Sequence, residues 1–177
     1  GQIYFKLGIL LMADKELPYS TEAEKAVLGG ILRDPECLVM IEGLLIPEHF
    51  FSDAHRRIYS VICQLSANNE VADILTVADR LRSTKDGVEP IAPAFLVELT
   101  ESCPVAQNVE YYAQIIRTDY YRRQIINACQ DTIRDAKAFE GSIDGFIERI
   151  EKEFLSIASD NHKKGIILAS EVLESTI

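Results

Sequence analysis

The sequence lacks the short motifs that mark a nucleotide-binding or hydrolytic enzyme. No GxxxxGK[ST] segment occurs in its 177 residues, and the Gly29-Gly30 pair is not followed by the lysine that such a loop requires. Neither HExxH nor GxSxG is present. The sequence therefore offers no loop to cradle a nucleoside triphosphate, and nothing in it favours a zinc protease or a hydrolase with a nucleophile elbow.

Histidine is scarce and dispersed. The three histidines, His49, His55 and His162, lie far apart, so the sequence gives no set of metal ligands. His55 falls at the start of a predicted helix, where we interpret it as a polar contact rather than a catalytic group. We therefore expect no catalytic residue, no metal and no cofactor within these residues.

Basic residues are also fewer than acidic ones. The chain has 18 Lys and Arg against 28 Asp and Glu, a formal net charge of -10. Proteins that hold nucleic acid without sequence preference do so by neutralising phosphates with Lys and Arg. We therefore expect little direct binding of nucleic acid. The apolar run Gly8–Ala13 is too short to span a membrane.

The four cysteines form no CxxC pair. Cys37, Cys63, Cys103 and Cys129 each lie among apolar neighbours. We interpret them as buried, reduced thiols of a cytosolic protein, although the sequence does not exclude disulfides. At the N-terminus we take residues 1–16 as a leader, with Gly1–Leu11 an addition ahead of a natural start at Met12, and leave it out of the fold prediction.

What the chain does contain is helical periodicity. Apolar residues make up 47% and charged residues 26%, as in ordinary globular domains. No segment alternates like a strand, so we predict an all-α fold. We expect a compact head of short helices over residues 17–104. The first helix begins at Thr21, which is predicted to be the N-cap of a capping box with Glu24. The other helices are predicted over residues 34–41, 53–65, 73–81 and 94–100.

A helical hairpin is predicted over residues 105–158. One long helix covers Asn108–Phe139, and Gly141 is a typical stop after it. The second helix begins near Ser142 and carries apolar residues in alternating steps of four and three. These five residues, which we call the seam, are Ile143, Ile147, Ile150, Phe154 and Ile157. Such a heptad pattern packs against a partner helix.

After the hairpin the sequence becomes polar. Ser159–Gly165 is typical of a linker, and Ile166–Ile177 is predicted to be a short amphipathic helix. We assign residues 159–177 as a linker region in which Val172 and Leu173 dock onto another domain.

Aromatic and arginine residues gather on the long helix. Tyr120, Tyr121, Arg122 and Arg123 are neighbours there. Tyrosine and arginine are favoured anchors of protein interfaces, and they also bind single-stranded nucleic acid. A third possibility is a solvated face with some core tyrosines. Given the acidic charge of the chain, we assign these residues to the docking of a protein partner.

Several local patterns together resemble the N-terminal domain of DnaB-type bacterial replicative helicases. The patterns are Ser20–Glu24 with Val27–Gly29, Phe50-Phe51 with His55-Arg56 and Ile58-Tyr59, Asp73–Leu81, and Leu96–Leu99 with Pro104, Asn108, Tyr112 and Ile115–Arg117. Each is mostly a helix pattern, but their order and spacing are specific. The resemblance covers Leu17–Ile177 and departs from the family at Glu89–Pro93, where a Gly-Gly is usual.

The resemblance implies a collar in a bacterial, cytoplasmic, hexameric DNA helicase that unwinds DNA at the replication fork. ATP and Mg would bind in a RecA-like motor domain beyond the linker. Hairpins would pair between subunits, giving dimers and a trimer of dimers. The collar would also recruit the C-terminal domain of primase and, in some members, a helicase loader.

The residues support self-association independently of this resemblance. Burying an apolar side chain contributes about 1.5–3 kcal/mol, so the five seam residues are not expected to stay in water. A second hairpin would cover them, whereas the alternative is a monomer whose hairpin folds back on its head. A stand-alone helical adaptor is the competing function.

Overall fold

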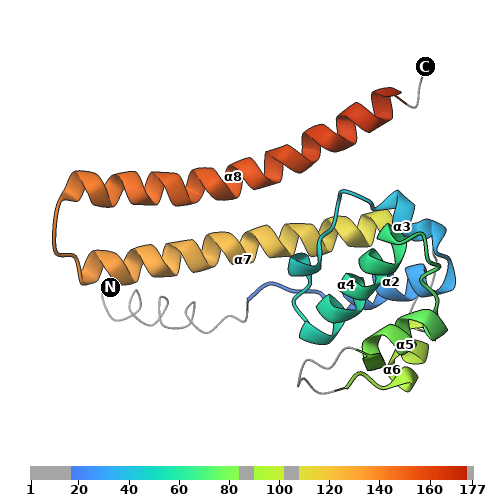
Figure 1. Ribbon diagram of the computed structural model, residues 1–177. Helices are drawn as coiled ribbons and strands as arrows, with labels where there is room; N and C mark the ends of the chain where they lie inside the picture. The colour runs from blue at the N-terminus through green and yellow to red at the C-terminus, as the bar shows by residue number, and fades with distance from the viewer. Residues whose placement is uncertain (1–16, 84–89, 102–107, 175–177) are drawn as a thin grey trace, which may run out of the picture.

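The structure, a computed structural model, describes residues 17–83, 90–101 and 108–174, with side chains described as far as residue 161. These residues form seven α-helices and one 3-10 helix, and no strand occurs among them. A head of short helices lies at one end of a long antiparallel hairpin (Figure 1). The predicted all-α class is confirmed.

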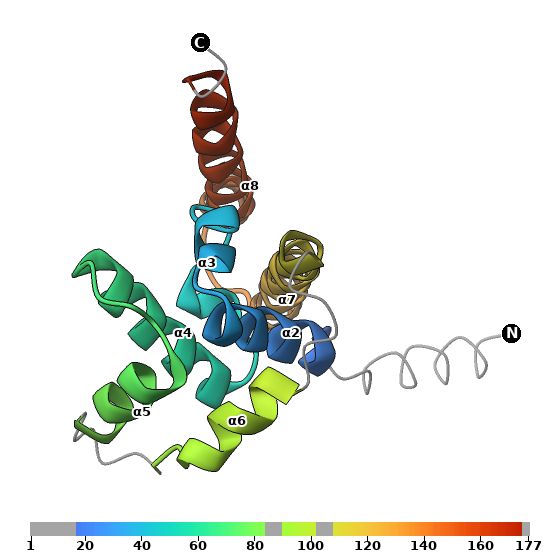
Figure 2. The same ribbon diagram turned by 90° about the vertical axis from the view of Figure 1, so that its right-hand side faces the viewer.

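The head contains α2 (Thr21–Arg33), α3 (Glu36–Met40), η1 (Pro47–His49), α4 (Asp53–Ala67), α5 (Ile74–Ser83) and α6 (Pro93–Glu101). Helix α2 lies in the middle of the head and packs against α6 and against α7 (Val109–Lys137), the first helix of the hairpin (Figure 2). This central position explains why α2 is buried over most of its length, with Val27, Leu28 and Ile31 fully buried.

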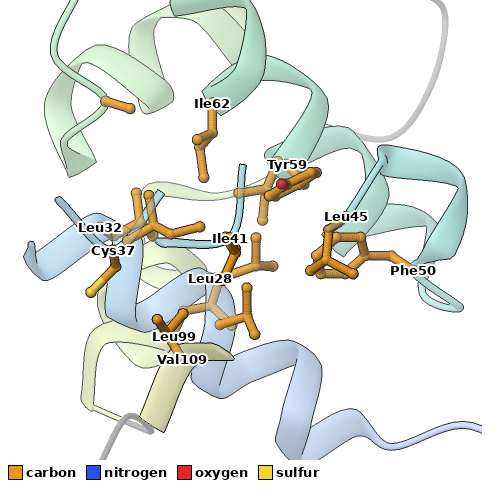
Figure 3. Close-up of a cluster of buried hydrophobic side chains, with 14 of the residues drawn as sticks. Leu28, Leu32, Cys37, Ile41, Leu45, Phe50, Tyr59, Ile62, Leu99 and Val109 are labelled. Carbon is orange, nitrogen blue, oxygen red and sulfur yellow. The ribbon is translucent and has the colours of Figure 1, made fainter. Parts of the chain in front are cut away.

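The core of the head is built from apolar side chains of its five α-helices and of the start of α7 (Figure 3). Leu28 of α2, Tyr59 and Ile62 of α4 and Leu99 of α6 are each at most 1% exposed. Phe50 joins them from the turn after η1, with its ring centre 4.8 Å from that of Tyr59. At about 1.5–3 kcal/mol for each fully buried side chain, this cluster makes a large contribution to the stability of the head.

The start of α2 differs from the predicted capping box. Ser20, not Thr21, is the N-cap, and its hydroxyl accepts a hydrogen bond from the Ala23 amide at 3.2 Å. Glu24 is buried and turns away from the N-cap, because its carboxylate accepts hydrogen bonds from the amides of Phe51 and Ser52. The predicted cap was therefore wrong by one residue, and Glu24 fastens α2 to the start of α4.

The turn between the two hairpin helices lies close to its predicted position. Helix α7 ends at Lys137, two residues before the predicted Phe139, and α8 (Ile143–Glu174) begins one residue after Ser142. Gly141 in the connecting turn has φ +136°, a conformation that side chains disfavour, which agrees with its predicted role. Cys37 is buried and Cys63 half-buried, but Cys129 is exposed, against the expectation, and Cys103 lies outside the described residues.

The C-terminal helix is longer than predicted. Helix α8 continues without a break through Ser159–Gly165, where a linker was expected, and it moves away from α7 toward its C-terminal end (Figure 1). The separate helix from Ile166 was therefore wrong. The side chains of Val172 and Leu173 lie outside the described residues, so their docking remains a prediction.

Candidate interaction surfaces of the hairpin

Polar contacts hold the two hairpin helices together at both ends. Near the head, the Arg117 guanidinium donates to the backbone carbonyl and the side-chain oxygen of Asn161, at 2.8 and 2.9 Å. Near the tip, Arg149 of α8 lies 2.9 Å from the Asp135 carboxylate of α7. The hairpin is thus an antiparallel pair whose register is fixed by side chains at each end.

The chain itself covers the seam on α8 only in part. Ile143 and Ile147 keep 56% and 48% of their surface exposed, and Ile150, Phe154 and Ile157 are only half-buried. Helix α8 packs against α7, and the seam occupies the part of α8 that lies away from the head (Figure 1). The head therefore does not cover the seam.

Helix α7 has two different halves. In the half that crosses the head, Val109, Ala113 and Ile116 are buried. Beyond the head the apolar stripe continues at heptad spacing but loses its cover, since Ile126 is half-buried and Ile133 is 56% exposed. Both hairpin helices thus present partly uncovered apolar residues over the same distal stretch, which is typical of a surface that packs against another helix.

Arg123 does not lie on the surface where we expected it. The residue is 8% exposed, and its guanidinium donates to the backbone carbonyls of His49 at 2.7 Å and Pro18 at 2.8 Å. It also lies 5.4 Å from the centre of the Phe51 ring, within the range of a cation–π contact. Arg123 thus joins the hairpin to the head.

Burial also affects the pKa of Arg123. Loss of solvent lowers the pKa of its guanidinium, while the nearby carboxylates of Glu24 and Asp119 oppose that shift. The same Glu24 binds His55 of α4, with 2.6 Å between its Oε2 and the Nδ1 of the imidazole. The polar role expected for His55 is confirmed, and Glu24 and Arg123 both contact residues between η1 and α4.

The other three docking candidates remain accessible. Tyr120 and Tyr121 are half-buried, and Arg122 is exposed, with its guanidinium 2.9 Å from the Asp119 carboxylate. The Tyr120 ring packs on His49 of the head, with 4.6 Å between ring centres. Burial raises the pKa of Tyr120, and the neighbouring Tyr121, Glu48 and Asp160 raise it further. The structure thus keeps three of the four predicted docking residues at the surface of the hairpin.

A cleft of about 360 Å³ opens between α7 and α8 beside these tyrosines. Its walls include Tyr120, Tyr121 and Asp131 from α7 and Glu153 and Asp160 from α8. Sequence reasoning missed its acidic residues, because they come from two helices and meet only when the hairpin closes. The one available signal was the predicted antiparallel pairing, which brings these parts of the two helices together.

The described residues show no grouping of His, Cys, Asp and Glu that could hold a metal ion. In the same residues, every helix is too short or too polar to cross a membrane. On the hairpin, the described surface offers an apolar seam, an acidic cleft and a Tyr–Arg cluster.

Residues 16–118 match the model of the DnaB-like helicase N terminal domain, which covers the head and the first part of α7. The chain belongs to this family. A replicative DNA helicase DnaB of Geobacillus stearothermophilus is 30% identical over 166 residues, which make up 94% of this chain but 37% of that protein. The DnaB of Treponema pallidum is 33% identical over 144 residues, 80% of this chain and 32% of that protein. The chain thus spans about a third of the length of these relatives.

Solved structures share the fold. The N-terminal domain of DnaB helicase from Mycobacterium tuberculosis aligns with a TM-score of 0.69 at 27% identity, over 79% of this chain and 99% of that one. A DnaB-like replicative helicase, described together with its interactions with primase, aligns with a TM-score of 0.63 over 88% of this chain and 35% of that one. At 24% identity the second match concerns the fold alone.

Proposed function

We propose that this chain is the N-terminal collar of a hexameric replicative DNA helicase, in which it mediates self-association and partner docking. The observation that carries the proposal is the uncovered seam, with Ile143 and Ile147 about half exposed on the hairpin. The relatives of this chain are replicative helicases. Packing against the hairpin of a second copy would bury an apolar stripe of this length. Pairs of hairpins would then assemble as a trimer of dimers.

The seam can be tested by replacing its apolar side chains with a charge. We expect Ile147→Asp and Ile150→Asp to halve the mass of the assembly, because a buried carboxylate opposes helix pairing while the head core stays intact. Light scattering at equal protein concentration measures the mass, and circular dichroism checks that the helices remain.

The matched control is Leu75→Asp, which places the same charge on an apolar residue of the head that is 79% exposed. This variant is expected to keep the mass of the unmodified chain. An unchanged mass in both seam variants would remove the seam from the interface.

We propose that the exposed Tyr–Arg cluster docks the C-terminal domain of primase, and in some assemblies a helicase loader. Support comes from the accessible Tyr121 and Arg122 and from the family to which the chain belongs. Since Arg123 is buried in the joint with the head, its charge reversal would damage that joint, so the test uses Arg122 alone.

We expect Arg122→Glu to weaken primase binding about 5- to 30-fold, the effect of roughly 1–2 kcal/mol at an interface charge. Titration calorimetry with the primase C-terminal domain measures the affinity. Arg82→Glu, a charge reversal at an exposed position of the head, is the control and should bind like the unmodified chain. Equal affinity for all three proteins would point to another docking surface.

The competing function is a stand-alone helical adaptor. The chain covers only 37% of the Geobacillus relative and 32% of the Treponema relative, which favours the collar of a longer protein. Reading the gene beyond Ile177 separates the two: a GxxxxGK[ST] segment downstream supports the collar, whose motor domain would bind ATP and Mg, and a stop codon supports the adaptor.

A further inference from the structure

The cleft between α7 and α8 combines two chemical features that attract the same kind of ligand. Tyr120 and Tyr121 supply aromatic rings, and Asp131, Glu153 and Asp160 supply carboxylates. As far as side chains are described, no lysine or arginine lines the cleft. Aromatic faces and carboxylates both stabilise an organic cation, the rings through their quadrupole and the carboxylates through charge-assisted hydrogen bonds.

The two tyrosine rings already attract guanidinium groups of the chain itself. The Arg117 guanidinium carbon lies 5.7 Å from the centre of the Tyr121 ring, and that of Arg123 lies 5.9 Å from the centre of the Tyr120 ring. Both arginines are committed elsewhere, Arg117 to Asn161 and Arg123 to backbone carbonyls of the head. Each tyrosine ring thus lies within cation–π range of a guanidinium group, but no arginine among the described side chains lines the cleft itself.

The electrostatic environment of the cleft is negative. Asp131, Glu153 and Asp160 all line the cleft. Burial raises the pKa of Tyr120, and the neighbouring Tyr121, Glu48 and Asp160 raise it further. Asp131 is ion-paired with Arg134 at 2.8 Å, but the Arg134 and Asp131 side chains are 70% and 49% exposed, so water screens that pair and leaves the carboxylate open to competition. Glu153 and Asp160 are exposed, and among the described side chains neither forms an ion pair.

We propose that this cleft binds an arginine-bearing segment of a partner protein. The arginine side chain would lie along the tyrosine rings and donate hydrogen bonds to the carboxylates of the two helices. Arginine suits the cleft better than lysine, because its planar guanidinium stacks on rings and binds carboxylates with two hydrogen bonds at once. This inference rests on the docking role proposed for Tyr120 and Tyr121, and it gives the partner a basic chemistry.

The test is a titration of the full chain with a nine-residue peptide of alternating arginine and glycine, at about 150 mM salt, where charges beyond about 8 Å are screened. The comparison peptide carries citrulline in place of arginine, which keeps the shape and removes the charge. We expect the arginine peptide to bind at least tenfold more tightly. Equal binding of the two peptides, or no binding of either, would overturn the proposal.

A variant with Asp131→Asn, Glu153→Gln and Asp160→Asn identifies the site and is expected to lose at least tenfold in affinity for the arginine peptide. The matched control is Glu22→Gln, Glu36→Gln and Glu42→Gln, which removes three negative charges at exposed positions of the head. The control is expected to change affinity less than threefold. Equal losses in the two variants would mean attraction to net charge alone, which contradicts the proposal. Should the triple cleft variant not fold, Glu153→Gln alone is expected to lose about threefold, and full affinity there would overturn the site.

The same titration on Ile150→Asp separates the cleft from the self-association proposed above. Equal peptide affinity in the unmodified chain and in this variant supports a partner segment as the occupant, whatever the mass of the assembly. Peptide binding that appears only in Ile150→Asp would mean that a second copy of the chain fills the cleft. That result would contradict a partner segment as its occupant.

Discussion

Two adjacent arginines of α7 have different roles, and the difference lies in what surrounds each. Arg122 points to solvent and pairs with Asp119, whereas Arg123 is enclosed by η1, the Pro18 segment and the Phe51 ring. Neighbours on a helix point about 100° apart, so one can face the head while the other faces water. The sequence places both in one cluster but does not reveal which side the head covers.

The joint made by Arg123 gives a prediction at this scale. Arg123→Met keeps much of the buried stem but leaves the carbonyls of Pro18 and His49 without their donor. Each buried carbonyl without a partner costs about 1–3 kcal/mol, so we expect the free energy of unfolding to fall by about 2–4 kcal/mol. Urea denaturation measures the loss. Arg122→Met, the same change at the exposed neighbour, should stay within about 0.5 kcal/mol of the unmodified chain, and an equal loss in both would refute the joint.

Glu24 illustrates what a local pattern can and cannot predict. Its place three residues after Thr21 is typical of a capping box, and the helix does begin where that pattern predicts it. The carboxylate nevertheless binds the amides of Phe51 and Ser52 and the ring of His55, all more than 25 residues away. One sequence contains the local pattern but not these distant partners, so the helix was predictable and the contact was not.

At the scale of elements, helix positions follow the apolar periodicity closely. Helices α4, α6 and α7 begin within one residue of their predicted starts, because apolar spacing and capping residues such as Ser52 are local. The continuation of α8 through Ser159–Gly165 was missed because polar residues and a glycine resemble a linker. The backbone nevertheless stays helical through these residues.

The continuity of α8 is testable by changing one residue. Proline in a helix interior costs about 3 kcal/mol and removes an amide donor, so Ser159→Pro should reduce the helical circular dichroism signal and speed amide exchange across residues 156–165. Ser159→Ala removes the same hydroxyl while keeping the amide, and it should leave both signals unchanged. If Ser159→Pro also left them unchanged, this stretch would be a linker in solution.

At the scale of the whole molecule, the head and the hairpin differ in how completely each buries the apolar residues that define it. The head encloses its core, with residues such as Phe50, Ile58 and Leu96 fully buried. The distal hairpin leaves Ile133, Ile143 and Ile147 about half in water. Leu75 of the head is exposed as well, but on the distal hairpin the exposed apolar residues recur at helical spacing on two paired helices. The heptad spacing predicted the seam, whereas the acidic cleft depends on the register between two helices and emerged only from the structure.

The mass of the unmodified chain in solution tests the central claim most directly. Sedimentation equilibrium over a range of concentrations reports that mass without regard to shape. If two hairpins cover one another's seams, the chain sediments as a dimer or a larger even assembly at high concentration and dissociates on dilution. A single species with the mass of one chain at every concentration would contradict the account.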